Sequence, residues 1–161
     1  MIVGNGDIAS ILEDRFDVIF FAAGVSNSSE TREDEFQREM NLLKEQDTSK
    51  CIFYFSSIAL DDTSVDTPYL NHKRKVEQFI KLNFKNYNII RIGNITWGKN
   101  PNTFINYIKN KLSKGEEVEI KDVYRFVINQ KDLLLLTKNL PSIGQNQISI
   151  FSKMGKVKDF L

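Results

Sequence analysis

The sequence predicts an α/β domain with a mainly parallel sheet, and two observations lead to this fold class. Short apolar runs alternate with segments in which apolar residues recur at helical spacing, which is the order of parallel strands joined by crossover helices. The apolar runs are nearly continuous, as expected of strands that are covered on both faces. With 161 residues, 41% of them hydrophobic, the chain is long enough for one ordinary core, so a single domain over residues 1–161 is expected.

The apolar runs predict four strands, of which the first is clipped. They lie at residues 1–3, 17–23, 51–56 and 88–92. Two further strands are expected at residues 118–120 and 125–128. Cys51 is the single cysteine and opens one of these runs, where a buried and inert thiol is the ordinary outcome.

Helical periodicity fills the intervals between the strands. Thr31, followed three residues later by Asp34, resembles a helix start, and Phe36, Met40 and Leu43 then share one face. Further helices are expected from Pro68 onward, from Phe104 to a stop at Gly115, and over residues 132–140, and residues 157–161 resemble the beginning of another.

A glycine-rich turn follows the first apolar run. It fits the pattern G-x-G-x-x-A and is made by Gly4, Asn5, Gly6, Asp7, Ile8 and Ala9. Glycines at this place let the backbone approach a pyrophosphate, whose charge meets exposed amides and the positive end of a following helix. The pattern therefore predicts a phosphate-binding turn that opens a helix, with an ordinary strand-to-helix turn as the alternative. No acidic residue stands about 20 positions later to hold an adenosine ribose.

The strongest chemical signal is a serine pair followed by a tyrosine and a lysine. Ser56 and Ser57 end the third apolar run, and Tyr69 and Lys73 stand four positions apart on the next helix, so one helical face presents both side chains. A phenol has an ordinary pKa of about 10, which a nearby ammonium lowers toward the range where the phenol exchanges protons with a hydroxyl or carbonyl. Ser57 would orient the same oxygen. The alternative is a solvated Tyr/Lys helix face after a serine-rich loop.

With these features in order, the sequence resembles the extended short-chain dehydrogenase/reductase superfamily, which includes NAD-dependent epimerases, dehydratases and reductases of nucleotide-sugars. Residues 17–23 are similar to the family strand that ends in small residues beside the cofactor, and residues 91–94 with Trp97 and Gly98 resemble the next strand and the loop that borders nicotinamide and substrate. Arg125 and Asp132 lie in a segment similar to one near the substrate's phosphates. The resemblance implies an abbreviated Rossmann-like three-layer domain.

The resemblance also implies roles for particular residues. The catalytic group would be Ser57, Tyr69 and Lys73. A cofactor, NAD or NADP, would be held by Gly4, Asn5, Gly6, Asp7, Ile8, Ala22, Ala23, Gly24, Lys73 and Asn94. A substrate would be bound by Ser56, Ser57, Asn94, Trp97 and Arg125. Trp97 is equally explained as an aromatic residue that closes the core.

Two departures from the family pattern concern the cofactor and the substrate. The chain passes from the glycine turn to the equivalent of the family's fourth strand, without the second and third strands that form the adenosine-binding wall. The C-terminal substrate-binding portion is also reduced. The sequence thus favours an NAD(P)-dependent enzyme that acts on a sugar or nucleotide-sugar. The alternative is a non-catalytic binding or regulatory module. A homodimer through the helices at 30–44 and 68–82 would supply part of the missing wall.

Composition argues against several other classes of protein. Lysine and arginine total 22 against 21 acidic residues, a net charge of +1, which offers no electrostatic footprint for nucleic acid or an anionic membrane. No run approaches the roughly 20 apolar residues of a membrane span, so a cytoplasmic protein is expected. His72 has neither cysteine nor a second histidine beside it, so no metal site is expected and an exposed helix position is predicted for it.

Overall fold

The main sheet contains five strands, all parallel, in the order β1-β2-β3-β4-β7. The computed structural model describes residues 1–118 and 123–160. The strands are β1 Ile2–Val3, β2 Val18–Phe21, β3 Cys51–Ser57, β4 Tyr87–Ile92 and β7 Gln145–Ile150. The predicted α/β class with a mainly parallel sheet is therefore confirmed.

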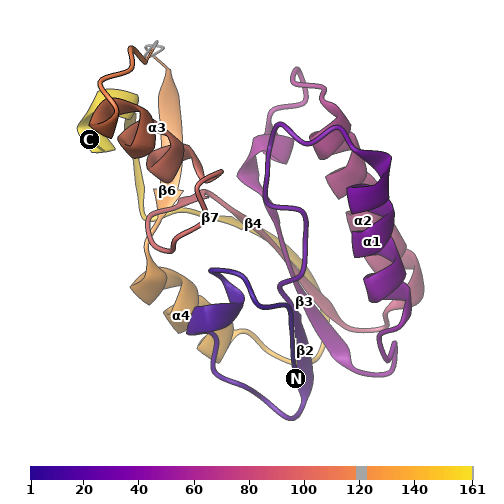
Figure 1. The fold of residues 1–161 in the computed structure, drawn as a ribbon. Helices are drawn as coiled ribbons and strands as arrows, with labels where there is room; N and C mark the ends of the chain where they lie inside the picture. Colours follow the sequence, from indigo (N-terminus) through magenta and orange to yellow (C-terminus); the bar gives the residue numbers. More distant parts are fainter. Residues whose placement is uncertain (119–122, 161) are drawn as a thin grey trace.

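Helices cover both faces of this sheet (Figure 1). On one face lie α1, Glu33–Lys44, and α2, Pro68–Asn83, and on the other lie α4, Gln130–Asn139, and the short 3-10 helix η1, Ala9–Ile11. Successive strand residues point to opposite faces. Ile19 and Phe21 accordingly pack with the α1/α2 side, whereas Val18 and Phe20 pack with the α4 side. This arrangement gives the three layers that the sequence predicted.

A smaller sheet stands beside the main one, with the order β5-β6-β8. Its strands are β5 Asn94–Ile95, β6 Tyr124–Ile128 and β8 Lys153–Lys156, and β6 pairs with β8 in antiparallel fashion. Helix α3, Phe104–Ser113, and the 3-10 helix η3, Val157–Phe160, complete this lobe, while η2, Ile58–Asp61, follows β3. Within the described residues, no helix combines the length and the apolar character that crossing a membrane requires.

Most of the predicted elements are present, with shifted ends. Helix α2 begins at Pro68 because the Thr67 hydroxyl accepts a hydrogen bond from the Leu70 amide at 3.1 Å. Helix α1 begins at Glu33, and its N-terminal residue Arg32 makes no side-chain cap, so the start predicted at Thr31 is displaced. The strand predicted at 118–120 falls largely outside the described residues. Strands β5, β7 and β8 were not predicted.

The prediction that the glycine turn opens an α-helix is wrong. The turn leads into η1, which spans three residues, and the chain is extended again from Leu12. The physical reason is length: few residues separate the turn from β2, and they include the consecutive acids Glu13 and Asp14 ahead of Arg15. Too little chain remains for several helical turns with an apolar face. A full helix dipole is therefore not aimed at this turn.

Parallel pairing places the ends of β1 to β4 along one edge of the sheet. At this carboxyl edge lie Gly4, the segment 22–24, Ser57 and Asn94. In open α/β sheets this edge is where ligands bind. The topology thus brings to one place the segments that the sequence singled out.

The packing of Gly4 yields a stability test. Gly4 has a φ of 120°, and a Cβ on it would stand 2.5 Å from the Ala22 carbonyl oxygen, whereas a Cβ on Gly6 would meet nothing within 4 Å. We expect Gly4→Ala to lower the free energy of unfolding by more than about 1 kcal/mol, and Gly6→Ala to change it by no more than about 0.5 kcal/mol. Urea denaturation of the two variants measures the difference. Equal stabilities would show that β1 is not packed against β2 in this way.

Candidate active site

The glycine turn presents backbone amides that the protein itself does not use. Within the described part of the chain, the amides of residues 5–8 donate no hydrogen bond, while the turn is fixed from behind by the Ser10 amide, which donates to the Gly6 carbonyl at 3.0 Å. Asn5 and Gly6 are exposed. Consecutive free amides at a turn form an anion-binding concavity. The turn retains this capacity without the helix that was predicted to follow it.

Asp7 connects the glycine turn to the loop that follows β5. Its two carboxylate oxygens accept hydrogen bonds from the amides of Lys99, at 3.1 Å, and Asn100, at 3.0 Å. Its carbonyl accepts one from the Trp97 indole at 3.1 Å. Trp97 is half-buried and packs against the core on the α4 side. The core-closing interpretation of Trp97 therefore has direct contacts to support it, and the ring also stands at the carboxyl edge.

Tyr69 and Lys73 lie on the same face of α2, as their spacing predicts. Both are buried, Tyr69 with 8% and Lys73 with 1% of its surface exposed. The Lys73 amine lies 5.6 Å from the centroid of the Tyr69 ring. The Tyr69 hydroxyl has no hydrogen-bond partner among the described residues, and it is not one of the side-chain oxygens that are cut off from solvent. The phenol is thus held beside a cation with its hydroxyl uncommitted.

The Lys73 amine is fully engaged by two other side chains. It donates to both carboxylate oxygens of Glu39, at 3.1 and 3.3 Å, and to the Tyr54 hydroxyl at 2.9 Å. An ammonium has three protons to donate, and these contacts use all three. A Cβ on Gly24 would stand 2.9 Å from the amine, so the amine lies directly behind the end of β2. Lys73 could reach a cofactor ribose, as the resemblance implies, only by giving up one of these partners.

Glu39 is the centre of this buried cluster. Besides Lys73, its carboxylate accepts hydrogen bonds from the Tyr54 hydroxyl at 2.7 Å and the Val25 amide at 2.8 Å, and it lies 2.9 Å from His72 Nε2. Burial raises the pKa of Glu39, but the Lys73 charge and the other hydrogen bonds outweigh burial and bring the pKa from an ordinary 4.5 to about 2. Burial also raises the pKa of Tyr54 well above 10, so Tyr54 is a neutral donor. Glu39 is therefore ionised at neutral pH.

The prediction that His72 is an exposed helix residue is wrong. Its surface is 5% exposed, its ring stacks on Phe36 at 4.6 Å between centroids, and its Nε2 contacts Glu39. The reason is helix geometry: His72 adjoins Lys73 and points between α2 and α1, where Glu39 offers an acceptor. Spacing within α2 could not reveal this partner, because Glu39 belongs to α1.

The two serines take different positions. The Ser57 hydroxyl accepts from the Ala59 amide at 3.3 Å and caps η2, and it makes no hydrogen bond with Tyr69. Ser56 is buried and donates to Glu77 at 2.7 Å. Glu77 in turn accepts two hydrogen bonds from the Arg91 guanidinium, at 2.7 and 3.0 Å. In the structure Ser56 thus belongs to a buried polar network, while Ser57 stands at the carboxyl edge.

The remaining candidate residues lie toward the small lobe. The Asn94 side-chain amide donates to the Phe126 carbonyl at 3.1 Å and thereby joins β5 to β6. Arg125 is exposed, with its guanidinium 5.1 Å from the centroid of the Phe104 ring. Ala22 and Ala23 are half-buried at the end of β2. Their roles toward a cofactor or substrate remain predictions.

Glu39 is the central residue of this cluster, and sequence reasoning missed it. A signal for it was present: Glu39 stands three residues after Phe36 and four before Leu43, on the apolar face of α1. A carboxylate on a buried helix face requires a buried partner. Glu77, four residues after Lys73, carries the same signal on α2.

Comparison with solved structures shows that the fold is similar to those of several known proteins, among them a UDP-glucose 4-epimerase. The enzyme WbmG of Bordetella bronchiseptica, in complex with NAD, matches with a TM-score of 0.65 and 13% identity over 89% of this chain and 53% of that chain. UDP-glucose 4-epimerase of Thermotoga maritima, with UDP-glucose, matches with a TM-score of 0.65 and 15% identity over 88% and 58%. The capsular polysaccharide assembling protein CapF of Staphylococcus aureus matches with a TM-score of 0.55 and 22% identity over 88% and 41%.

These matches confirm the predicted likeness at the level of the fold. The chain spans about half the length of the solved structures, in agreement with the shortened form that the sequence indicated. No protein-family model matches the sequence, and no curated protein matches it either.

The Glu39 cluster predicts a large effect of one substitution. Glu39→Gln leaves the Lys73 ammonium buried without a counter-charge, which we expect to cost about 3–5 kcal/mol in the free energy of unfolding at pH 7. The matched control is Glu35→Gln, one turn earlier on α1, whose half-exposed pair with Arg38 is worth no more than about 1 kcal/mol. Urea titrations of both variants measure the difference.

The same variants test the pH dependence. Because the folded pKa of Glu39 lies below its unfolded value, its contribution is present above pH 4.5 and is lost as the pH falls toward 2. The stability of Glu39→Gln should therefore fall less than that of the wild type across this interval. Parallel curves would contradict an ionised Glu39.

Proposed function

We propose that this chain is an NAD(P)-dependent enzyme of the epimerase, dehydratase or reductase type that acts on a sugar or nucleotide-sugar, with Tyr69 as its proton-transfer residue. The proposal rests on the free amides of the glycine turn, on Ser57 at the carboxyl edge and on the Tyr69 phenol, which has no hydrogen-bond partner among the described residues, in a fold similar to that of solved nucleotide-sugar epimerases. Solved neighbours whose names include NAD, UDP-glucose and UDP-N-acetylglucosamine support it.

The residues present fit the phosphate part of a dinucleotide. Free amides at residues 5–8 suit a pyrophosphate, and the segment 22–24 at the end of β2 consists of small residues. The adenosine part has less to bind, because β1 is an edge strand of the described sheet. The cofactor, when bound, would supply the acceptor or donor for a hydride at a sugar carbon.

The chain's own residues would handle the proton. Tyr69 would accept the proton of a substrate hydroxyl, or return one to a carbonyl, since its hydroxyl has no protein partner in the described chain. The Lys73 amine lies 5.6 Å from the centroid of the Tyr69 ring and is paired with the Glu39 carboxylate. Ser57 would hydrogen-bond the same substrate oxygen once it turns from the Ala59 amide.

A second function is favoured by a specific observation. All three protons of the Lys73 amine are committed to Glu39 and Tyr54, and η1 replaces the helix that normally supports pyrophosphate. Both features weaken a cofactor site and favour the alternative of a non-catalytic binding or regulatory module. Cofactor binding separates the two functions.

The function is tested by cofactor titration followed by a single substitution. We expect calorimetry with oxidised and reduced NAD and NADP to show saturable binding to the wild type, and absorbance at the nicotinamide band to report turnover across a panel of nucleotide-sugars. Tyr69→Phe should then lose at least about 100-fold in kcat. Because the hydroxyl has no protein partner among the described residues, the variant should unfold within about 0.5 kcal/mol of the wild type. Absence of binding at millimolar cofactor would instead support the module.

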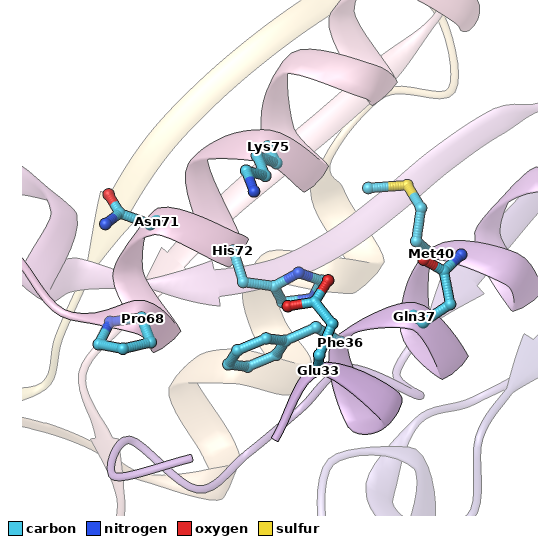
Figure 2. Close-up of a pocket in the computed structure, with 8 residues that line it drawn as sticks. All are labelled: Glu33, Phe36, Gln37, Met40, Pro68, Asn71, His72 and Lys75. Carbon is cyan, nitrogen blue, oxygen red and sulfur yellow. The ribbon is translucent and has the colours of Figure 1, made fainter. Parts of the chain in front are cut away.

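The outer face of α1 and α2 supports the proposed homodimer. A groove of about 470 Å³ separates the two helices, with His72 projecting from α2 toward Phe36 of α1 (Figure 2). The groove is lined by Glu33, Phe36, Gln37, Met40, Pro68, Asn71, His72 and Lys75. A two-fold axis would set this surface against its own copy. Glu33 and Lys75 carry opposite charges that such an arrangement can pair.

A charge reversal tests this interface. We expect light scattering after size exclusion to give twice the mass of one chain for the wild type, and Lys75→Glu to shift the protein toward monomer because it would face Glu33 of the partner. Lys81→Glu, an exposed position on α2 outside the groove, is the matched control and should remain dimeric. A wild type that is monomeric at every concentration would exclude the dimer.

A further inference from the structure

Residues 97–100, here called the strap, are hydrogen-bonded to the segments that follow β1 and β2. Asp7 fixes the strap to the glycine turn through the amides of Lys99 and Asn100, and the Asn100 side chain donates to the Ser26 hydroxyl after β2 at 3.0 Å. The Trp97 indole adds the hydrogen bond to the Asp7 carbonyl. The strap is thus attached at both β1 and β2, on the edge where the free amides lie.

The strap is built around the Asp7 carboxylate. Gly98 has a φ of 94°, and a Cβ on it would overlap the Asp7 carboxyl group. A glycine at this position therefore serves two needs at once, the left-handed backbone and the space for the carboxylate. Hydrogen bonds from two adjacent amides to one carboxylate are charge-assisted and stronger than neutral ones. The contact is specific to an acidic residue at position 7.

The position of this contact opposes anion binding. Asp7 belongs to the same turn as the unpaired amides of residues 5–8, so its negative charge and the strap that it holds both stand next to the place where a phosphate would bind. We propose that Asp7 holds the strap closed as an autoinhibitory contact, and that a phosphate-bearing ligand must release the strap in order to reach these amides. The nature of the ligand rests on the proposed function, whereas the contact itself does not.

Release of the strap should appear as a gain in affinity. A ligand that binds only the open form has an apparent Kd raised by the reciprocal of the open fraction. If about one molecule in ten is open, a variant that opens the strap gains about tenfold in affinity. A loop that merely anchors Trp97 to the core would give no such gain.

Trp97 provides the measurement because it is the single tryptophan of the chain. Acrylamide quenching of its fluorescence reports exposure of the strap, and inorganic pyrophosphate and NAD are the two probes of binding. We expect Asp7→Ala to raise the quenching constant about twofold or more and to bind pyrophosphate about tenfold more tightly than the wild type. Asp47→Ala is the matched control, since Asp47 likewise accepts hydrogen bonds from nearby Ser49 but stands ahead of β3, at the opposite edge of the sheet.

Gly98→Ala separates release of the strap from loss of a charge. It displaces the strap by overlap with the carboxylate and keeps the Asp7 charge, so it should also raise quenching and tighten pyrophosphate binding. A gain in Asp7→Ala without any gain in Gly98→Ala would assign the effect to charge alone and overturn the proposal. Unchanged quenching in both variants would overturn it as well.

The two probes keep this proposal distinct from the proposed function. If both variants bind pyrophosphate more tightly while none of the proteins binds NAD, the strap is supported and the NAD-dependent enzyme is not. If NAD binds the wild type and both variants equally well, the enzyme is supported and the strap is overturned.

Discussion

One buried carboxylate determines how the layer of α1 and α2 meets the sheet. Glu39 of α1 binds Lys73 of α2, Tyr54 of β3 and the backbone at Val25 after β2, so three other segments meet at this residue. Neither the carboxylate nor the ammonium could be buried alone, because the desolvation of an unpaired charge costs several kcal/mol. The pair therefore restrains how α1 and α2 pack against each other and against the sheet. Tyr69, one turn before Lys73, takes its position at the carboxyl edge from this constraint.

The same constraint fixes the surroundings of Tyr69. Lys73 is buried and fully hydrogen-bonded, and its amine lies beside the Tyr69 ring without a hydrogen bond to the Tyr69 hydroxyl. Glu39 pairs with this amine and balances its charge, so one contact both stabilises the fold and determines which groups stand beside the phenol. A low dielectric keeps the attraction between the two buried charges strong.

The sequence predicts features that depend on residues close together in the chain, and it misses features that depend on contacts between distant segments. Continuous apolar runs identify β2, β3 and β4 because both faces of these strands are buried, and periodicity identifies the helices. The strand β7 escaped prediction because it is an edge strand of alternating exposure with glutamine and asparagine in it, and its pairing with β4 comes from backbone hydrogen bonds that composition does not record. The spacing of Tyr69 and Lys73 correctly placed them on one face. The partners of Lys73 come from other elements, so only the packed structure shows that Glu39 and His72 meet there.

The two ends of the proposed cofactor site differ in the way they are closed. Toward β3 the sheet is covered, and Lys73, Tyr54 and Glu39 seal the space behind the end of β2. Toward β1 the described sheet ends, and the amides of residues 5–8 donate no hydrogen bond to a described residue. A ligand bound at these amides would gain phosphate contacts there but bury little of whatever extended beyond β1, so its affinity would depend mainly on the phosphates. In such a half-walled site, a strap held by an acidic residue of the phosphate turn has a larger effect on affinity than it would in a complete one, because fewer other contacts compensate for it.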